Sequence, residues 1–362
     1  MKISAGNVIP ATNHTWFEIA QQPVLWPSTP ERVKNAIRQQ ELQALLGSAR
    51  VILTGAGTSA HIASAIAAGW PKATAVPSTD LLVDTERYIA DADVLISIGR
   101  SGNSPESMAV VNRVNSIQPE IIHLALTCNS DGALAQSPLI RPILLDPRTD
   151  DKSLVMTSSF SNLVIGGYCL YDEVSIDNVV ADASAYAREE FDNINEGAKR
   201  TAASVRERIV LLASSPMFAW AQEGSLKSLE MTAGRFPVLA ETYLGLRHGP
   251  MSFVRPDTVV LCLLSNDALR RKYELDLVQE LRTKGLGRLV GIGAKPEDAA
   301  LFDELIPAVT PEIADHLRTP FEMIGPQLLG YHLSLRVGLN PDNPSESGII
   351  TRVVEGVRIH QE

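Results

Sequence analysis

The 362-residue sequence has few cysteines, few aromatic residues and no long apolar run. Its three cysteines, Cys128, Cys169 and Cys262, lie far apart and form no C-x-x-C pair, which argues against a disulfide framework and a zinc ribbon and indicates a reducing cytoplasm. The longest apolar runs, such as Val259–Leu264, are too short to span a bilayer, and the first residues contain no apolar core of a signal peptide. Membrane and secreted proteins are therefore not expected.

Basic residues are also outnumbered, with 32 Lys and Arg against 42 Asp and Glu and a formal net charge of −10. Nucleic acids and anionic membranes are not expected as partners, because both need a basic surface. A local basic pocket for a small anion is still allowed. The proportions of hydrophobic (45%) and charged (20%) residues are those of a globular protein, and the length predicts about two domains.

Short apolar runs alternate with helical patterns along most of the chain. The predicted strands lie at 51–54, 94–98, 121–126 and 143–145, and again at 209–213, 258–264, 289–292 and 305–309. The predicted helices lie at 28–46, 58–69, 104–116, 183–206, 222–234, 267–284 and 319–337, whereas residues 1–28 are expected to be irregular. Continuous apolar strands separated by helices predict an α/β fold of the doubly wound type, with parallel sheets flanked by helices.

The two halves of this pattern are similar to each other. Residues 50–53, RVIL, match 208–211, RIVL, and residues 93–96, DVLI, parallel 257–260, DTVV, at offsets of 158 and 164 residues. A nearly constant offset predicts a duplicated α/β domain. The expected division is an N-terminal segment and helix at 1–48, a first domain at 49–182, a helical linker at 183–206, and a second domain with a C-terminal tail at 207–362.

A first loop, 55–60 (GAGTSA), follows a predicted strand and precedes a helix. Its glycines let the backbone approach a ligand, and the backbone N–H groups and the helix dipole favour an anion beside Ser59. The loop also matches the G-x-G-x-x-A pattern of dinucleotide-binding proteins, and Asp80 follows at about the distance of a ribose contact. A nicotinamide dehydrogenase is therefore one alternative.

A second loop, 97–107, is rich in hydroxyl groups. Short donors and a cation lie close together at Arg100, Ser101, Asn103 and Ser104. Phosphate suits such a set, although Ser104 before Pro105 also fits a simple helix cap. A dinucleotide enzyme does not need this second loop, so the sequence favours a small sugar phosphate. A third group, Thr157 and Ser158, suits either sugar hydroxyls or a helix cap, and both interpretations stay open.

Candidate acid/base residues lie at Glu223, Lys227 and Glu230, where spacings of four and three place them on one helical face. We call these three residues the acid/base cluster; the alternative is a solvated surface salt bridge. His248 follows within the segment RHGP. Carboxylates, a histidine and a phosphate loop together can move a proton beside a carbonyl group. The histidines show no metal spacing, so no metal and no other cofactor is expected.

The motifs GAGTSA, GRSGNSPES, LTCN, MTSS, EGSLKSLE, RHGP and the SGIITRVVEGVRIH tail, in this order, resemble the sugar isomerase (SIS) domain family. The resemblance implies a deaminase/isomerase that acts on an amino-sugar 6-phosphate such as galactosamine 6-phosphate. It implies phosphate binding by Ser59, Ser101 and Ser104 with the backbone near Arg100, and sugar contacts near Thr157 and Ser158. It also implies that Glu230 moves a proton between C1 and C2, supported by Glu223 and Lys227. His248 would assist ring opening, often from a neighbouring subunit, so a homo-oligomer with a shared site is expected.

Three departures from related amino-sugar synthases refine this expectation. No cysteine precedes Cys128, so a glutamine-hydrolysing domain is not expected and ammonia is released rather than installed. The tail carries Arg358 and His360 where those synthases place a Schiff-base lysine. The second domain opens with ASSPM at 213–217 instead of a glycine-rich loop, so phosphate is expected in the first domain only. A sugar-phosphate-sensing module and a deglycase of another sugar 6-phosphate remain alternatives, and the tail is a candidate to fold back onto the site.

Overall fold

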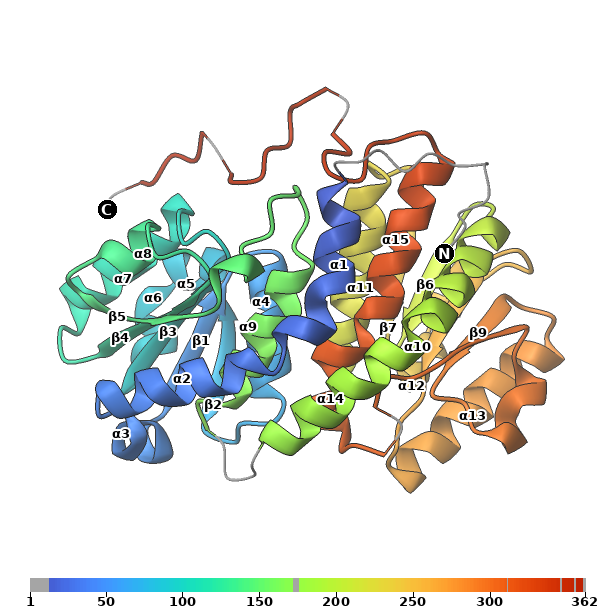
Figure 1. Cartoon of the computed structure of the whole chain (residues 1–362), viewed down its shortest axis with the longest axis horizontal. Coiled ribbons are helices and arrows are strands. Elements are labelled where there is room, and N and C mark those ends of the chain that lie inside the picture. Colours follow the sequence, from blue (N-terminus) through green and yellow to red (C-terminus); the bar gives the residue numbers. More distant parts are fainter. Residues whose placement is uncertain (1–12, 172–175, 311, 346, 355, 361–362) are drawn as a thin grey trace.

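The computed structural model describes residues 13–171, 176–310, 312–345, 347–354 and 356–360 and consists of two α/β halves (Figure 1). The first half contains a parallel sheet in the order β2-β1-β3-β4-β5, with β1 Val51–Gly55, β2 Ala73–Pro77, β3 Val94–Gly99, β4 Ile122–Thr127 and β5 Ile140–Leu144. The second contains a parallel sheet in the order β10-β9-β8-β6-β7, with β6 Ile209–Leu212, β7 Val238–Glu241, β8 Val259–Leu263, β9 Arg288–Ile292 and β10 Glu304–Ile306. The predicted parallel α/β fold is confirmed.

The predicted duplication is visible in the strand order. Read from its other edge, the second sheet runs β7-β6-β8-β9-β10, which repeats the order of the first. Val51 of β1 pairs with Val94 of β3, and Ile209 of β6 pairs with Val259 of β8. The second offset is therefore 165 residues, one more than the sequence suggests, because Val259 and not Thr258 is the partner of Ile209.

Helices flank both sheets. In the first half they are α4 Thr58–Ala67, α5 Ser78–Val83, α6 Thr85–Ile89, α7 Pro105–Ile117, α8 Ala133–Gln136, η1 Pro147–Thr149 and α9 Ser158–Tyr168. In the second half they are α11 Phe218–Met231, α12 Tyr243–Leu246, η2 Pro250–Phe253, α13 Ala268–Thr283, η3 Pro296–Leu301, α14 Asp315–Glu322 and α15 Ile324–Arg336. The remaining helices are α1 His14–Leu25, α2 Ser28–Gln39, α3 Gln43–Ser48 and α10 Ile176–Ser204. None of the described helices is long and apolar enough to cross a membrane.

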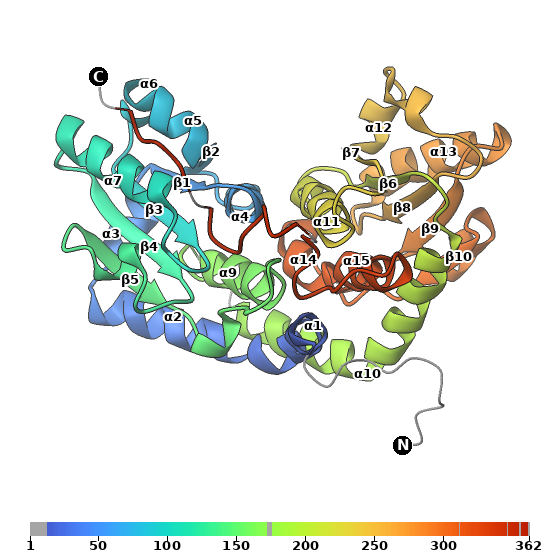
Figure 2. The ribbon, with the colours of Figure 1, turned by 90° about the horizontal axis from the view of Figure 1, so that it is seen from above.

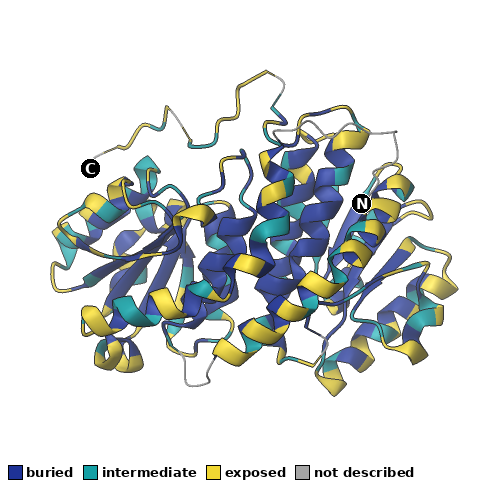
Figure 3. Ribbon diagram, in the orientation of Figure 1, coloured by how far each residue is buried: buried dark blue, intermediate teal, exposed yellow. Residues whose placement is uncertain are grey.

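The two halves share one hydrophobic core. Helix α4 packs against α11 and α9 packs against α14, so the central helices are buried between the sheets (Figures 2 and 3). Trp26 contacts both halves. Its ring lies edge-on to Phe321 of α14 in the second half, with centroids 5.1 Å apart, and its indole N–H donates to the Ser161 hydroxyl of α9 in the first half at 2.8 Å. This shared core holds α4 and α11 beside each other.

The N-terminal region differs from the expectation of irregular structure at 1–28. Residues 1–12 lie outside the described part of the chain, but α1 begins at His14, where the Asn13 side chain caps the Trp16 N–H. Pro23 misleads the prediction because it lacks the N–H that would bond to the Ile19 carbonyl. The Gln22 side chain donates to that carbonyl at 3.0 Å instead, so the helix continues to Leu25.

Other element boundaries also differ. The helix predicted at 28–46 breaks between α2 and α3, where Glu41 has a φ of 55°. The predicted linker helix begins earlier, at Ile176, because Ile176 and Val180 extend its buried stripe. The helix predicted at 319–337 is two helices that meet at Met323. Strands β2 and β7 were not predicted, since both are short strands at or near a sheet edge with few fully buried residues.

Candidate active site

The first and second loops meet at the carboxyl edge of the first sheet. The chain leaves β1 toward β2 on one side, and it leaves β3 toward β4 on the other. Strands β1 and β3 therefore flank a topological switch point, where open α/β sheets bind ligands. Gly57, with a φ of 56°, makes the turn into α4, and Ser59 lies in the first turn of that helix.

The acid/base cluster faces α4 from the second half. The Glu223 and Lys227 side chains are fully buried, and Lys227 Nζ lies 3.3 Å from Glu223 Oε1. Thr58 Oγ1 donates to the same Glu223 oxygen at 3.1 Å and accepts from Lys227 Nζ at 3.2 Å. The alternative of a solvated surface salt bridge is therefore wrong, because two of the three charges lie inside the protein.

Glu230 is the member of the cluster that reaches the surface. Its side chain is 30% exposed, and its Oε2 lies 2.5 Å from Lys227 Nζ. Burial disfavours the charge on Lys227, but the carboxylates of Glu223 and Glu230 outweigh that effect and raise the pKa of Lys227. The cluster thus holds a buried ammonium between one buried and one accessible carboxylate.

His61 is a residue of this group that the sequence reasoning missed. It lies on α4, and its Nδ1 is 2.8 Å from Glu223 Oε2. The signal was present in the sequence, since Thr58 and His61 are three residues apart and share one face of a helix. Nothing in the sequence indicated which carboxylate they would meet, 162 residues away from His61.

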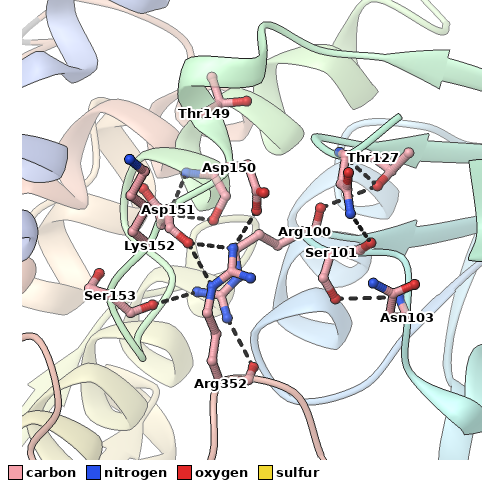
Figure 4. A network of polar contacts seen from close by, with 12 residues as sticks. Arg100, Ser101, Asn103, Thr127, Thr149, Asp150, Asp151, Lys152, Ser153 and Arg352 are labelled. Carbon is pink, nitrogen blue, oxygen red and sulfur yellow. Dashed lines mark hydrogen bonds and ion pairs between the residues drawn. The ribbon is translucent and has the colours of Figure 1, made fainter. Parts of the chain in front are cut away.

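The second loop is held in shape by side chains around it (Figure 4). Asn129 Nδ2 donates to the Ser101 carbonyl at 3.1 Å, and Asn103 Oδ1 accepts from the Ala133 N–H at 2.9 Å. Ser104 precedes α7 but its hydroxyl does not cap that helix; it donates to Glu106 at 2.7 Å. A Cβ on Gly132 would meet the Ser101 carbonyl oxygen at 2.2 Å, so the backbones approach here as only glycine allows.

Arg100 is buried and faces the protein backbone. Its guanidinium donates to the carbonyl groups of Ser153, Leu154, Val155 and Arg352 at distances of 3.0–3.3 Å. In Figure 4, the Arg100 guanidinium points toward Ser153 and Arg352, away from Ser101 and Asn103. Arg100 therefore ties the second loop to segment 153–155 and to the C-terminal tail.

Thr157 and Ser158 are fully buried at the start of α9. Asp151 caps this helix: its carboxylate accepts from the backbone N–H groups of Thr157, Ser158 and Ser159 at 2.8–3.1 Å. Burial raises the pKa of Asp151, against these hydrogen bonds. Of the two open interpretations of the third group, the helix start is the one these contacts describe. Asp151 was not predicted, because the cap lies six residues before Thr157.

The C-terminal tail folds back over the first half (Figure 2). The Arg352 guanidinium donates to the Asp150 carboxylate and to the Asp151 carbonyl, both at 2.5 Å, and its own carbonyl accepts from Arg100 (Figure 4). Arg358 and His360 are exposed. The expectation that the tail returns toward the loops therefore agrees with the contacts of Arg352.

His248 lies elsewhere in the second half. It is exposed in the turn after α12, where Arg247 is held by ion pairs to Asp276 and Glu280 of α13 at 3.0 and 2.7 Å. Within the described residues, its ring makes no hydrogen bond to the acid/base cluster.

The equivalent position in the second half is filled by the protein itself. After β8, the Asp315 carboxylate accepts from the Ser265 hydroxyl and from the Asn266 N–H at 2.9 Å. Arg318, fully buried, pairs with Asp315 and Glu322, each at 3.3 Å. In the second half, an internal carboxylate thus accepts the hydrogen bonds that the loop after β8 offers.

Comparisons with known proteins agree with this architecture. A family model described as SIS domain matches residues 44–165. The chain is 35% identical to D-galactosamine-6-phosphate deaminase AgaS of Escherichia coli, with 97% of each chain covered, and 34% identical to that of Shewanella sp. (strain ANA-3), with 95% and 90% covered. Its structure is similar to that of tagatose-6-phosphate ketose/aldose isomerase from Escherichia coli, with a TM-score of 0.86 and 31% identity over 98% of this chain and 99% of that one. The chain belongs to the SIS domain family.

Proposed function

We propose that the protein is an amino-sugar phosphate deaminase/isomerase that converts galactosamine 6-phosphate to tagatose 6-phosphate and ammonia. The observation that carries the proposal is the contact of the acid/base cluster with Thr58 and His61, one and two residues from Ser59 of the first loop. This contact brings proton-transfer groups of one half beside a candidate phosphate loop of the other. The names of the full-length relatives point to the same amino sugar and to the same ketose.

The sugar phosphate binds in the first half. Ser59, Ser101 and Ser104 supply hydroxyl donors at the carboxyl edge of β1 and β3, and Arg100 fixes the backbone of the second loop. The Asp315 carboxylate in the equivalent place of the second half supports a single phosphate site. Because the phosphate group fixes one end of the open-chain sugar, C1 and C2 extend toward α11.

Glu230 is the base in this proposal. It removes the proton from C2 of the open-chain amino aldose while the C1 oxygen takes up a proton, which gives an enolamine. Glu230 then returns the proton to C1, which leaves a protonated imine at C2 whose charge balances the proton taken up by the C1 oxygen. Lys227 stabilises the ionised form of Glu230, and Glu223 compensates the charge of Lys227.

Water completes the reaction. It adds to the C2 imine, and ammonia leaves as the ketose carbonyl forms, so the overall change is a hydrolysis of the C–N bond. The reaction needs no electron acceptor. His248 assists ring opening from the neighbouring subunit of a homo-oligomer, and the free thiols of the three cysteines suit the cytoplasm as the compartment.

The test is the release of ammonia and ketose phosphate from galactosamine 6-phosphate, with glucosamine 6-phosphate alongside. We expect equal amounts of both products from galactosamine 6-phosphate, and Glu230→Gln should lower kcat by about 10²–10⁴-fold while the thermal unfolding curve is unchanged. Wild-type protein that turns over neither sugar, but is stabilised against heat by one of them, would replace this proposal by a sugar-phosphate-sensing module.

A further inference from the structure

We infer that His61 is a positioning residue of the acid/base cluster: its Nδ1–H holds Glu223, and this contact keeps Lys227 available to Glu230. The inference rests on the proposed function, in which Glu230 is the base. It concerns a residue on α4, outside the helix that carries the cluster. His61 acts on the reaction through Glu223 and touches no reacting atom.

Four side chains form one continuous chain of contacts. His61 Nδ1 lies 2.8 Å from Glu223 Oε2, Lys227 Nζ lies 3.3 Å from Glu223 Oε1, and Lys227 Nζ lies 2.5 Å from Glu230 Oε2. The two ends are partly exposed, with 22% for the His61 side chain and 30% for that of Glu230, whereas Glu223 and Lys227 are fully buried. The chain therefore connects an imidazole near solvent to the base through the protein interior.

The partners of Glu223 determine the tautomer of His61. Thr58 and Lys227 both direct donors to Glu223 Oε1, which favours the ionised carboxylate. An ionised carboxylate only accepts hydrogen bonds, so His61 Nδ1 must carry the proton that points to Oε2. Neutral His61 is thus the Nδ1–H tautomer, and Nε2 is its unprotonated nitrogen.

Among the described residues, the elements with the most extensive packing against α4 carry no charge outside the cluster that could take over this role. These elements are β1, β2, β3, α9 and α11. The strands carry no titratable side chain, and α9 carries only the buried Tyr168 near its far end. On α11 the titratable groups are the three members of the cluster, whose formal charges sum to −1. His61 is the donor that serves the second oxygen of Glu223.

Removal of the His61 donor should change the balance within the cluster. Without it, Glu223 Oε2 is a buried carboxylate oxygen without its donor, which is energetically unfavourable. Glu223 then draws Lys227 more strongly, and the contact of Lys227 with Glu230 weakens. Less stabilisation of the Glu230 carboxylate should therefore move the acidic limb of the activity profile to higher pH.

The experiment measures kcat/KM for galactosamine 6-phosphate against pH in the wild type, His61→Phe and His61→Asn. Asn places an amide N–H near the position of Nδ1, whereas Phe fills the space without a donor. We expect the acidic midpoint of the profile to move up by about one pH unit in His61→Phe, with a loss of about tenfold below it, and to stay near the wild-type value in His61→Asn. An unshifted midpoint in His61→Phe, or the same shift in both variants, would overturn the inference.

A second readout does not depend on turnover. The ¹⁵N spectrum of the wild-type imidazoles, with His61 assigned by the signals missing in His61→Asn, should show a protonated Nδ1 and an unprotonated Nε2 for neutral His61. An Nε2–H tautomer would overturn the inference even if the enzyme is active. Wild-type protein that processes no amino-sugar phosphate but shows the Nδ1–H tautomer would instead refute the proposed function and leave the contact of His61 with Glu223 in place.

Discussion

At the scale of single residues, Lys227 is a fully buried cation between two carboxylates. Lys227→Met keeps the unbranched shape of the side chain without its ammonium group and leaves Glu223 as an uncompensated buried charge, which should cost about 3–5 kcal/mol of unfolding free energy. Urea denaturation measures this loss. Leu229→Met, on the exposed side of the same helix, is the matched control and should change stability by less than about 0.5 kcal/mol. Equal stability of Lys227→Met and the wild type would contradict the buried ion cluster.

Glu18 should make the unfolding free energy of the protein depend on pH. Its carboxylate accepts from the Lys152 N–H at 2.5 Å and from the Ser153 hydroxyl. Burial, and secondly the nearby Asp151 carboxylate, raises the pKa of Glu18 from 4.5 to about 7. Between pH 4.5 and about pH 7, Glu18 keeps its proton in the folded protein but has released it in the unfolded chain. The stabilisation is therefore complete below pH 4.5 and is lost as pH rises to about 7, by about 3 kcal/mol in total.

Glu18→Gln should remove this slope. The difference in unfolding free energy between wild type and variant, measured by urea denaturation from pH 4.5 to 7.5, should fall steadily in favour of the variant. Glu31→Gln, at an exposed position of α2, serves as the control and should leave the wild-type slope intact. Parallel curves for wild type and Glu18→Gln would show that Glu18 titrates normally in the folded state.

Functional residues could be grouped from the sequence where all of them lie on one helix. The spacing of Glu223, Lys227 and Glu230 gave the face of the helix correctly, because helical periodicity is local. Their burial was not predictable, since it depends on α4 covering that face. His61 and Glu18 were missed for the same reason: their partners lie 162 and 134 residues away in sequence. A local sequence pattern identifies a side chain but not its partner in the fold.

At the scale of elements, the C-terminal tail is held to the first half by Arg352. Arg352→Ala removes the contacts with Asp150 and with the Asp151 carbonyl, so we expect faster cleavage of the tail by proteinase K, read by mass spectrometry. Because Arg100 of the second loop also binds the tail, at the Arg352 carbonyl, KM for the sugar phosphate should rise about fivefold, equivalent to about 1 kcal/mol. Arg358→Ala, at an exposed tail position, should change neither quantity. Unchanged proteolysis and KM in Arg352→Ala would show that the tail contact is dispensable.

Some helices and strands were predictable from the sequence and others were not. Strands β1 and β8 were predicted because every residue in them is buried, and the sequence of each is therefore a nearly continuous apolar run. Strand β7 was missed since its four residues are only partly buried and its apolar run, at 238–240, is short. Helix α1 was missed because Pro23 lies inside it, and the compensating Gln22 side chain is not a signal that a sequence pattern carries.

At the scale of the whole molecule, the sequence repeat predicted two sheets of similar topology. It did not predict that the two sheets carry different residues at their carboxyl edges. The first half carries the hydroxyl-rich loops at its carboxyl edge, whereas in the second half Asp315 accepts from the loop after β8 and pairs with Arg318, and α11 carries the acid/base cluster. In the proposed function, each half alone is therefore incomplete as a site. The shared core around Trp26 and Phe321 is what combines them, and it arises from contacts between distant segments.

The same reasoning extends to the assembly. His248 is exposed in the turn after α12, and Leu244 of α12 and Leu229 beside Glu230 are exposed apolar side chains, 44% and 45% accessible. If His248 completes the site of a neighbouring subunit, a dimer of one Glu230→Gln chain and one His248→Ala chain contains one intact and one doubly altered site. Co-expression of the two inactive variants with different tags should therefore restore about a quarter of the wild-type activity, since about half of the dimers are mixed.

The matched control combines the wild type with the double variant Glu230→Gln/His248→Ala. In a shared-site dimer the mixed species has no intact site, so about a quarter of the activity remains, whereas a site within one chain would retain about half. Activity per chain, measured after both tags have been used to confirm the mixture, distinguishes the two arrangements. If the two single variants stay inactive together, then His248 does not act across a subunit boundary, and the proposal of a site shared between subunits is wrong.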